Sequence, residues 1–327
     1  MKRSVNQFKL IAMSLAMVFI LTHCSKSDDP TQTPEQNLEM SERLEEVFGI
    51  AQLNSINRLT IDWDDLRVEV SAMERRTGYE SGLRLLLRSL ADNHSFYTFA
   101  DGRFASESQI RCDGNVYDFS SLPDDIGYIK VNAFSGSTAE ALALANSIQQ
   151  SIREQDVDGL KGWVVDLSNN GGGNMYPMVA GLGPFYRQEL LGHFIGPTQQ
   201  EIEWGYSVDG SFIGDFTRKV TQVEDPYELK NPNLKVAVIV SNNTASSGEA
   251  TLISFMGREN TLLLGQPSCG LSTANSSFSL SNGDRFTLTV STMADRERTL
   301  FGGQIMPDEQ IDSDQDMLER VTEWINQ

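Results

Sequence analysis

The chain has 327 residues, with 45 acidic and 26 basic side chains and a formal net charge of −19 at neutral pH. So negative a balance disfavours a surface that binds nucleic acid or an anionic membrane. After the first 37 residues about 290 remain, which is enough for one large domain and a smaller one.

The first residues have the pattern of an export signal. Three Lys or Arg residues are followed by an apolar run, residues 10–21, that is too short to span a bilayer. The run leads to Cys24 in a Leu-Thr-His-Cys sequence that resembles the lipobox of bacterial lipoproteins, with His23 where a small residue is usual. We expect a lipoprotein signal peptide at 1–23 and lipidation of Cys24; the alternative is an ordinary cleaved signal with a chance cysteine.

Residues 24–37 are rich in Ser, Asp, Thr, Pro and Gln and almost without apolar side chains, which is typical of a tether. A signal, a modified cysteine and a tether together predict a protein of the bacterial cell envelope. It would be lipid-anchored at the outer membrane, either periplasmic or surface-exposed, and would contact the membrane only through its anchor.

Apolar residues recur at helical spacing through residues 38–97, without a strand pattern. Asp62 can cap a helix that begins near Trp63. These features predict a small helical N-terminal domain over residues 38–105. The apolar positions are Leu44, Val47, Phe48, Ala51, Leu66, Val70, Met73, Leu83, Leu86, Leu87 and Leu90.

From about residue 110 apolar strands alternate with helical segments, which predicts a layered α/β domain over residues 106–327. Residues 195–230 are polar and irregular, and we expect them to form an excursion over the site. Strands are expected at 126–131, 163–167, 236–240 and 261–264, with a hairpin of 277–280 and 286–290 around Asn282-Gly283. Helices are expected at 138–152, capped by Ser137 or Thr138, at 250–256, and at 315–325, capped by Asp314.

Two polar turns follow apolar strands. Ser246 lies in the turn after strand 236–240, directly before small residues that begin a helix, and a glycine turn at 171–173 follows strand 163–167. Free backbone N–H groups at a helix N-terminus can stabilise an oxyanion. The two turns therefore predict an acyl-transfer enzyme with Ser246 as its nucleophile.

A serine nucleophile needs a base within hydrogen-bond reach. The chain has three histidines, of which His23 falls in the expected signal, so His94 and His193 remain. No lysine occurs after Lys235, which excludes a downstream lysine base. His94 ends the last N-terminal helix, where a solvated histidine is the alternative to a catalytic one.

Other functional classes lack their motifs. The glycine turn carries no GKS or GKT sequence and no acidic ribose ligand, which disfavours nucleotide binding. Thr244 and Gly248 flank Ser246, so the GxSxG sequence of α/β-hydrolases is missing. No Cys or His spacing predicts a metal site. Cys112 and Cys269 can pair in an oxidising compartment or remain separate buried residues.

Several segments, in order along the chain, resemble the tail-specific or C-terminal processing protease family. The likeness covers most of the chain after residue 40. The segments are Leu90 to Ser95, Gly127 to Val131, Asp166 to Gly173, Thr244 to Glu249 with Gly265-Gln266-Pro267, Asp295-Arg296, and Ile305 to Asp308.

This resemblance implies a crotonase-like ββα catalytic core. It places the nucleophile three residues before a helix glutamate, at Ser246 before Glu249, with Ser247 as the local rival. It also implies an oxyanion hole made by the backbone N–H groups of Ser247 and of a glycine in the 171–173 turn, for which we expect Gly172.

Two departures from the family pattern point to its tricorn-core-like branch. Leu271 stands where Ser–Lys members have their lysine, and the stretch from His94 to Gly127 is too short for a PDZ module. That branch implies a histidine base from the N-terminal region, here His94. A base with a pKa near 6.5 would make activity rise through neutral pH.

The residue that orients the base is left open. Asn93 stands where the tricorn-like pattern has a serine, and the register of the expected C-terminal carboxylate falls near Phe301. Glu249 and Asp295, with Glu297, are the substitutes.

The sequence thus predicts a serine peptidase that acts on peptides or proteins without metal or cofactor. The alternatives are a non-catalytic member of the same fold that binds peptides or apolar ligands, and another acyl hydrolase such as an esterase.

Overall fold

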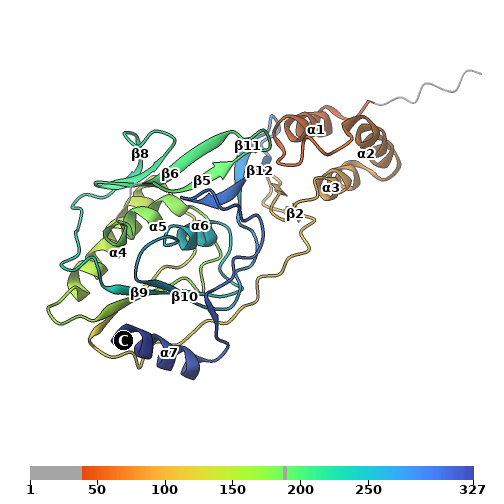
Figure 1. The fold of residues 1–327 in the computed structure, drawn as a ribbon. Helices are drawn as coiled ribbons and strands as arrows, with labels where there is room; N and C mark the ends of the chain where they lie inside the picture. Colours follow the sequence, from red (N-terminus) through yellow and green to blue (C-terminus); the bar gives the residue numbers. More distant parts are fainter. Residues whose placement is uncertain (1–38, 187–189) are drawn as a thin grey trace, which may run out of the picture. The chain divides into compact units, whose positions relative to one another are not determined.

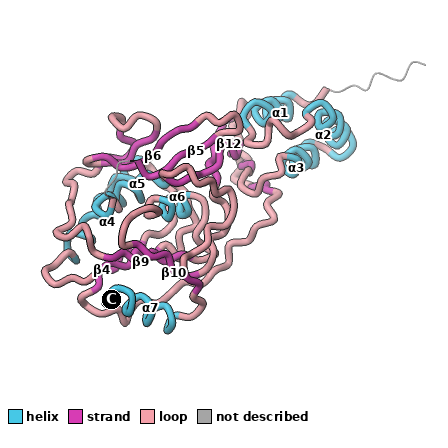
Figure 2. The backbone as a smooth tube through the Cα atoms, in the orientation of Figure 1, coloured by secondary structure: helices cyan, strands magenta, loops and turns pink. Residues whose placement is uncertain are grey.

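The computed structural model describes residues 39–186 and 190–327, so Cys24, the expected signal and the expected tether lie outside the described residues. The described part is built from two sheets and the helices that cover them (Figures 1 and 2). Its helices are α1 Glu42–Asn54, α2 Trp63–Thr77, α3 Tyr79–Ser89, α4 Thr138–Gln155, α5 Met175–Gly181, α6 Ser247–Ile253 and α7 Asp314–Asn326. Among the residues described, no helix combines the length and the apolar character that a membrane crossing needs.

A five-stranded parallel sheet forms the centre of the fold. It runs in the order β13 (Glu309–Gln310), β10 (Thr261–Gly265), β9 (Lys235–Val240), β4 (Gly162–Asp166), β3 (Ile126–Lys130). The side chains of β9 alternate between two apolar clusters, one shared with α4, α5 and α6 and the other with α7. Both faces are therefore buried, which is why these strands read as continuous apolar runs.

A second, antiparallel sheet has eight strands. Seven follow the order β2 (Phe104–Ser106), β1 (Phe96–Thr98), β12 (Arg285–Asp295), β5 (Leu190–Ile195), β6 (Glu201–Ser207), β7 (Gly210–Ile213), β8 (Lys219–Gln222), and β11 (Thr273–Ser279) pairs with β12. The expectation of an irregular excursion at 195–230 is wrong, because β6, β7 and β8 form an ordered meander. Exposed polar residues at the start of β6 weaken its apolar pattern.

Helices α1, α2 and α3 pack around the predicted apolar residues except Met73, which is half-buried and outside the cluster, and Asp62 caps α2. Two strands in this region were not expected. β1 pairs with β2 and with β12, so residues near 97 and residues near 286 share one sheet. Through β1 the end of the helical segment is fixed beside the hairpin of β11 and β12.

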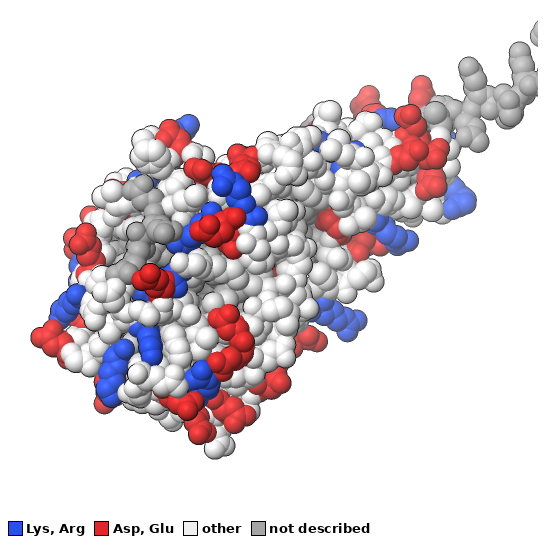
Figure 3. All heavy atoms as spheres, in the orientation of Figure 1, with Lys and Arg blue, Asp and Glu red and all other residues white. Residues whose placement is uncertain are grey.

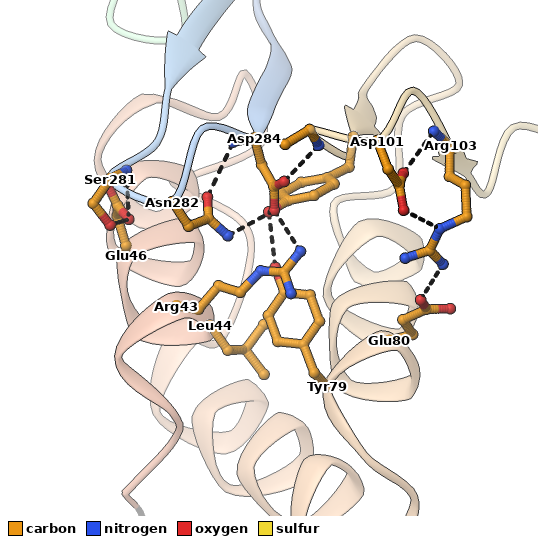
Figure 4. Close-up of polar contacts among 12 residues, drawn as sticks. Arg43, Leu44, Glu46, Tyr79, Glu80, Asp101, Arg103, Ser281, Asn282 and Asp284 are labelled. Atoms are coloured by element: carbon orange, nitrogen blue, oxygen red, sulfur yellow. Dashed lines mark hydrogen bonds and ion pairs between the residues drawn. The ribbon is translucent and has the colours of Figure 1, made fainter.

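A buried carboxylate, Asp284, joins α1 to that hairpin (Figure 4). Its oxygens accept hydrogen bonds from Arg43, Tyr97 and the backbone N–H of Ala100, the last at 2.7 Å. Burial alone would raise the pKa of Asp284, but the hydrogen bonds from Tyr97 and its other partners lower it below the usual value. The ionised carboxylate therefore holds the hairpin turn against the helices.

The helix ends follow local capping rules. Ser137 and Glu140 form a capping box at α4, as one of the two expected caps. Ser313, and not Asp314, caps α7, because the Ser313 hydroxyl accepts the N–H of Asp316 at 3.2 Å. Helix α6 begins three residues earlier than expected, directly after Ser246.

Cys112 and Cys269 form a disulfide, with their Cα atoms 5.2 Å apart. The segment after Cys112 also contacts the turn that follows β9. Asn243 accepts the N–H of Gly114 at 3.0 Å and donates its amide to the Gly114 carbonyl at 2.7 Å. The disulfide and these two hydrogen bonds therefore fasten the connection between β2 and β3 to the turn that carries Ser246.

Candidate active site

Ser246 lies in the turn between β9 and α6, at the carboxyl edge of the parallel sheet. Its backbone has φ +54° and ψ −116°, a region that residues with a side chain rarely adopt. Its N–H donates to the Glu249 carboxylate at 2.8 Å. This hydrogen bond offsets part of the strain and fixes the serine at the start of the helix.

Glu249 is fully buried, and its carboxylate holds the turn that carries Ser246 through hydrogen bonds. Besides Ser246, its carboxylate accepts hydrogen bonds from the Ser268 hydroxyl at 2.5 Å and the Gly270 N–H at 3.0 Å. Burial raises the pKa of Glu249 to about 7, although these hydrogen bonds oppose the shift. Its hydrogen bonds thus tie the Ser246 turn to residues 268–270, and none reaches His94.

The glycine turn approaches Ser246 at Gly172. Its φ is +102°, and a Cβ there would lie 2.8 Å from the Cβ of Ser246 and 2.9 Å from the Ala245 carbonyl oxygen. Only glycine allows this approach. The N–H of Gly172 donates to the Asn170 side chain at 3.1 Å, so it is engaged within its own turn rather than free for an oxyanion.

The backbone N–H groups directly after Gly172 and Ser246 remain free. Those of Gly173 and Ser247 have no acceptor among the residues that the structure describes, and both residues line the pocket discussed below. The Ser247 hydroxyl donates to the Gly173 carbonyl at 2.6 Å. That bond fixes the two N–H groups relative to each other and occupies the hydroxyl of the rival serine.

His94 is held by contacts that the sequence did not reveal. Its Nδ1 lies 2.8 Å from the Thr273 hydroxyl, and the Asn275 amide donates to its carbonyl at 3.0 Å. Its own N–H donates to the Asp92 carboxylate at 2.9 Å. Thr273 and Asn275 belong to β11, about 180 residues further along, and no local signal marks contacts of that sequence separation.

The His94 imidazole is kept neutral. Burial lowers its pKa from 6.5 to about 4, while nearby Asp92 and the hydrogen bond with Thr273 oppose the shift. The expected pKa near 6.5 is therefore too high. A neutral imidazole at pH 7 has a lone pair on one ring nitrogen and can accept a proton.

One pocket brings these groups together. It has a volume of about 1080 Å³ and is lined by Ser246, His94, Thr273 and both residues with free N–H groups. Leu271 lines it too, and no lysine is among its lining residues. Among the lining residues, His94 is thus the side chain that can serve as a general base at neutral pH.

The remaining candidates have other partners. Asp295 ends β12, where its carboxylate accepts the N–H groups of Glu297 and Thr299 at 2.9 and 2.8 Å. His193 is fully buried on β5, and its Nδ1 lies 3.6 Å from a Glu201 oxygen. In the described ranges no three His, Cys, Asp or Glu side chains are grouped so that they could hold a metal.

Comparison with known proteins gives one family and one curated relative. The model of peptidase family S41 matches residues 125–311. The nisin-resistance protein of Lactococcus lactis subsp. lactis is 28% identical over 202 residues, which is 60% of this chain and 59% of the relative. The match therefore spans less than two thirds of the relative's length.

Solved structures resemble the fold over most of its length. A lipoprotein from Streptococcus agalactiae has a TM-score of 0.69 at 20% identity, covering 87% of this chain and 95% of that one. The photosystem II D1 C-terminal processing protease has a TM-score of 0.55 at 14% identity, covering 84% and 94%. At these identities the likeness concerns the fold alone.

Proposed function

Because this chain belongs to peptidase family S41, we propose that it is a serine peptidase with Ser246 as nucleophile and His94 as general base. The observation that carries the proposal is that one pocket is lined by both side chains and by Gly173 and Ser247, whose backbone N–H groups are free in the described part of the chain. A nucleophile, a base and an oxyanion site are the parts that acyl transfer needs.

The Nδ1 of His94 lies 2.8 Å from the Thr273 hydroxyl. In this mechanism we assign the ring proton to Nδ1, which donates it to Thr273 and leaves the lone pair on Nε2. Nε2 accepts the Ser246 proton as the hydroxyl attacks the peptide carbonyl, and then returns it to the leaving amine. A water molecule hydrolyses the acyl-enzyme with the same base. Thr273 is thus a positioning residue in the place where many such enzymes have a carboxylate.

The oxyanion would be bound by the N–H groups of Gly173 and Ser247. This replaces the expected Gly172, whose N–H already has an acceptor. Gly172 keeps a different task in the proposal, because its missing side chain lets the glycine turn approach Ser246 closely enough.

The test of this function is labelling of the purified protein with a fluorophosphonate probe, together with release of fragments from a mixed peptide library. A peptidase should give both signals. Labelling without cleavage of any peptide would favour an esterase or another acyl hydrolase. Failure of both would favour a non-catalytic binding protein.

Thr273→Val should lower kcat by about tenfold to a hundredfold, because it removes the acceptor that selects the His94 tautomer. Valine has nearly the shape of threonine, so the pocket should keep its form. The measurement is kcat against pH, with Thr273→Ser as the matched control that restores the hydroxyl. Equal kcat in the valine and serine variants would argue against this role.

The substrate in this proposal is a peptide or protein outside the cytoplasm, and the protein is a lipid-anchored component of the cell envelope. The support is the lipobox-like sequence before Cys24 and the polar stretch after it. Mass spectrometry of the mature protein should find an acylated Cys24 as its first residue. A mature chain that begins at any other residue would refute the anchor.

We also propose the finer architecture implied by the sequence. Residues 106–327 would be a crotonase-like catalytic domain, and 38–105 a small helical N-terminal domain that carries the base and adds β1 and most of β2 to the antiparallel sheet. The support is the set of α4, α5 and α6 packed between the two sheets, and the family match, which lies wholly within 106–327.

A further inference from the structure

The pocket beside Ser246 differs in charge from the rest of the protein. The chain has 45 Asp and Glu residues, and acidic side chains are spread over the face drawn in Figure 3. No Asp or Glu is among the residues that line the pocket, and apart from His94 the one basic residue there is Arg285. The adjoining cavity of about 220 Å³ likewise has one arginine, Arg58, and no carboxylate.

Arg285 is exposed, and its side chain has no hydrogen bond or ion pair with the described residues. Its backbone is fixed, because it begins β12 beside the buried Asp284 and pairs with Thr98 of β1. Successive side chains of a strand point to opposite faces. Phe286 packs among the helices, so Arg285 and Thr287 face the pocket.

Residues 273–277 of the strand β11 line the pocket. It pairs with β12 and with no other described strand, so one of its edges is unpaired. Thr273, next to His94, lies six residues from Ser279, the partner of Arg285 in the hairpin. At about 3.3 Å per residue this is roughly 20 Å of strand. An extended peptide can add to such an edge through its backbone.

We infer that Arg285 binds a carboxylate of an extended peptide substrate, about five or six residues from the bond cleaved at Ser246. The inference rests on the proposed peptidase function and adds a preference in its substrates. The carboxylate belongs either to an Asp or Glu side chain or to the peptide's C-terminus. The pocket has an arginine without a partner among the described residues and no Asp or Glu in its lining, so it attracts a ligand carboxylate by charge complementarity.

Binding can be tested without turnover by using the Ser246→Ala protein. The probes are fluorescein-labelled peptides that carry Asp or Ala at each successive position, each made with a free and an amidated C-terminus. One position should bind about tenfold more tightly as Asp than as Ala, or the free C-terminus more tightly than the amide. These two results identify the side chain and the terminus, respectively, as the source of the carboxylate.

The preference should depend on the charge at residue 285. Arg285→Ala should remove it, Arg285→Lys should retain part of it, and Arg285→Glu should reverse it in favour of Lys at the same position. The reversal is a gain that an unfolded protein would not give. Arg218→Ala, which alters an exposed arginine outside both cavities, should behave as the parent protein.

Equal affinities for Asp, Ala and amidated peptides, or a preference that persists in Arg285→Ala, would overturn the inference. Failure of the proposed function has a different signature, because the wild-type protein would then show neither probe labelling nor peptide cleavage while the binding preference could still be measured.

Discussion

Replacing Ser246 with alanine should abolish fluorophosphonate labelling and lower kcat/KM for peptides by about 10³- to 10⁶-fold, the range seen when a triad member is lost. The serine is held at a positive φ by the turn between β9 and α6, with its N–H bonded to Glu249. Alanine has the same backbone preferences, so the loss would report the hydroxyl and not the fold.

Ser247→Ala is the matched control, one residue away. The Ser247 hydroxyl donates to the Gly173 carbonyl, so its loss should loosen the proposed oxyanion site but leave measurable labelling. Wild-type labelling in Ser246→Ala, or complete loss in Ser247→Ala alone, would move the nucleophile to the neighbouring residue.

Replacing His94 with alanine should lower turnover by about 10³- to 10⁶-fold. The side chain lines the pocket with Ser246, and its Nδ1 lies within hydrogen-bond distance of Thr273. In the proposed tautomer Nδ1 donates to Thr273, and Nε2 takes the serine proton. The measurement is single-turnover hydrolysis of a peptide that the wild-type protein cleaves. Near-normal activity in His94→Ala would refute a histidine base and favour a binding protein.

The wild-type pH profile adds a second readout. A protonated His94 cannot accept a proton, so kcat/KM should fall as pH drops through its pKa, which burial lowers to about 4. Activity should therefore already be near its plateau at pH 6. A step near pH 7 that disappears in Glu249→Gln would report Glu249, whose pKa burial raises to about 7.

His193→Ala serves as the comparison for His94→Ala. His193 is buried on β5 and does not line the pocket. Its removal should cost stability, measured as a lower Tm, while the folded fraction keeps its activity. Loss of activity in a well-folded His193→Ala protein would contradict the assignment of the base.

The parallel sheet could be predicted from the sequence because each strand is buried on both faces. Residues 236–240 contact helices on one side and α7 on the other, so every position is apolar. Of the antiparallel sheet, the hairpin of β11 and β12 around Asn282-Gly283 could be predicted. Its other strands could not, because they combine exposed and buried positions irregularly, as in β6. In this sheet β1 pairs with β12, which is almost 190 residues further along the chain, and local sequence patterns do not encode pairings of that sequence separation.

The residues of the candidate site likewise fall into those that the sequence predicts and those that it does not. Ser246 and the glycine turn could be found because each lies in the polar turn that follows a buried strand. Thr273 could not be linked to His94, because their contact depends on how β11 pairs with β12. The choice between Gly172 and Gly173 depends on which N–H the Asn170 side chain accepts, a detail of turn conformation that glycine repeats do not reveal.

The disulfide closes a loop of great length, because Cys112 and Cys269 are 157 residues apart in sequence. In the chain-entropy model a crosslink of this span lowers the conformational entropy of the unfolded ensemble and stabilises the fold by about 5 kcal/mol. Cys269 also donates its N–H to the Thr244 carbonyl at 2.8 Å, two residues before Ser246. Formation of the disulfide thus couples the stability of the protein to the chain segment that carries Ser246. A reduced chain has a larger unfolded ensemble to search before that segment reaches its native position.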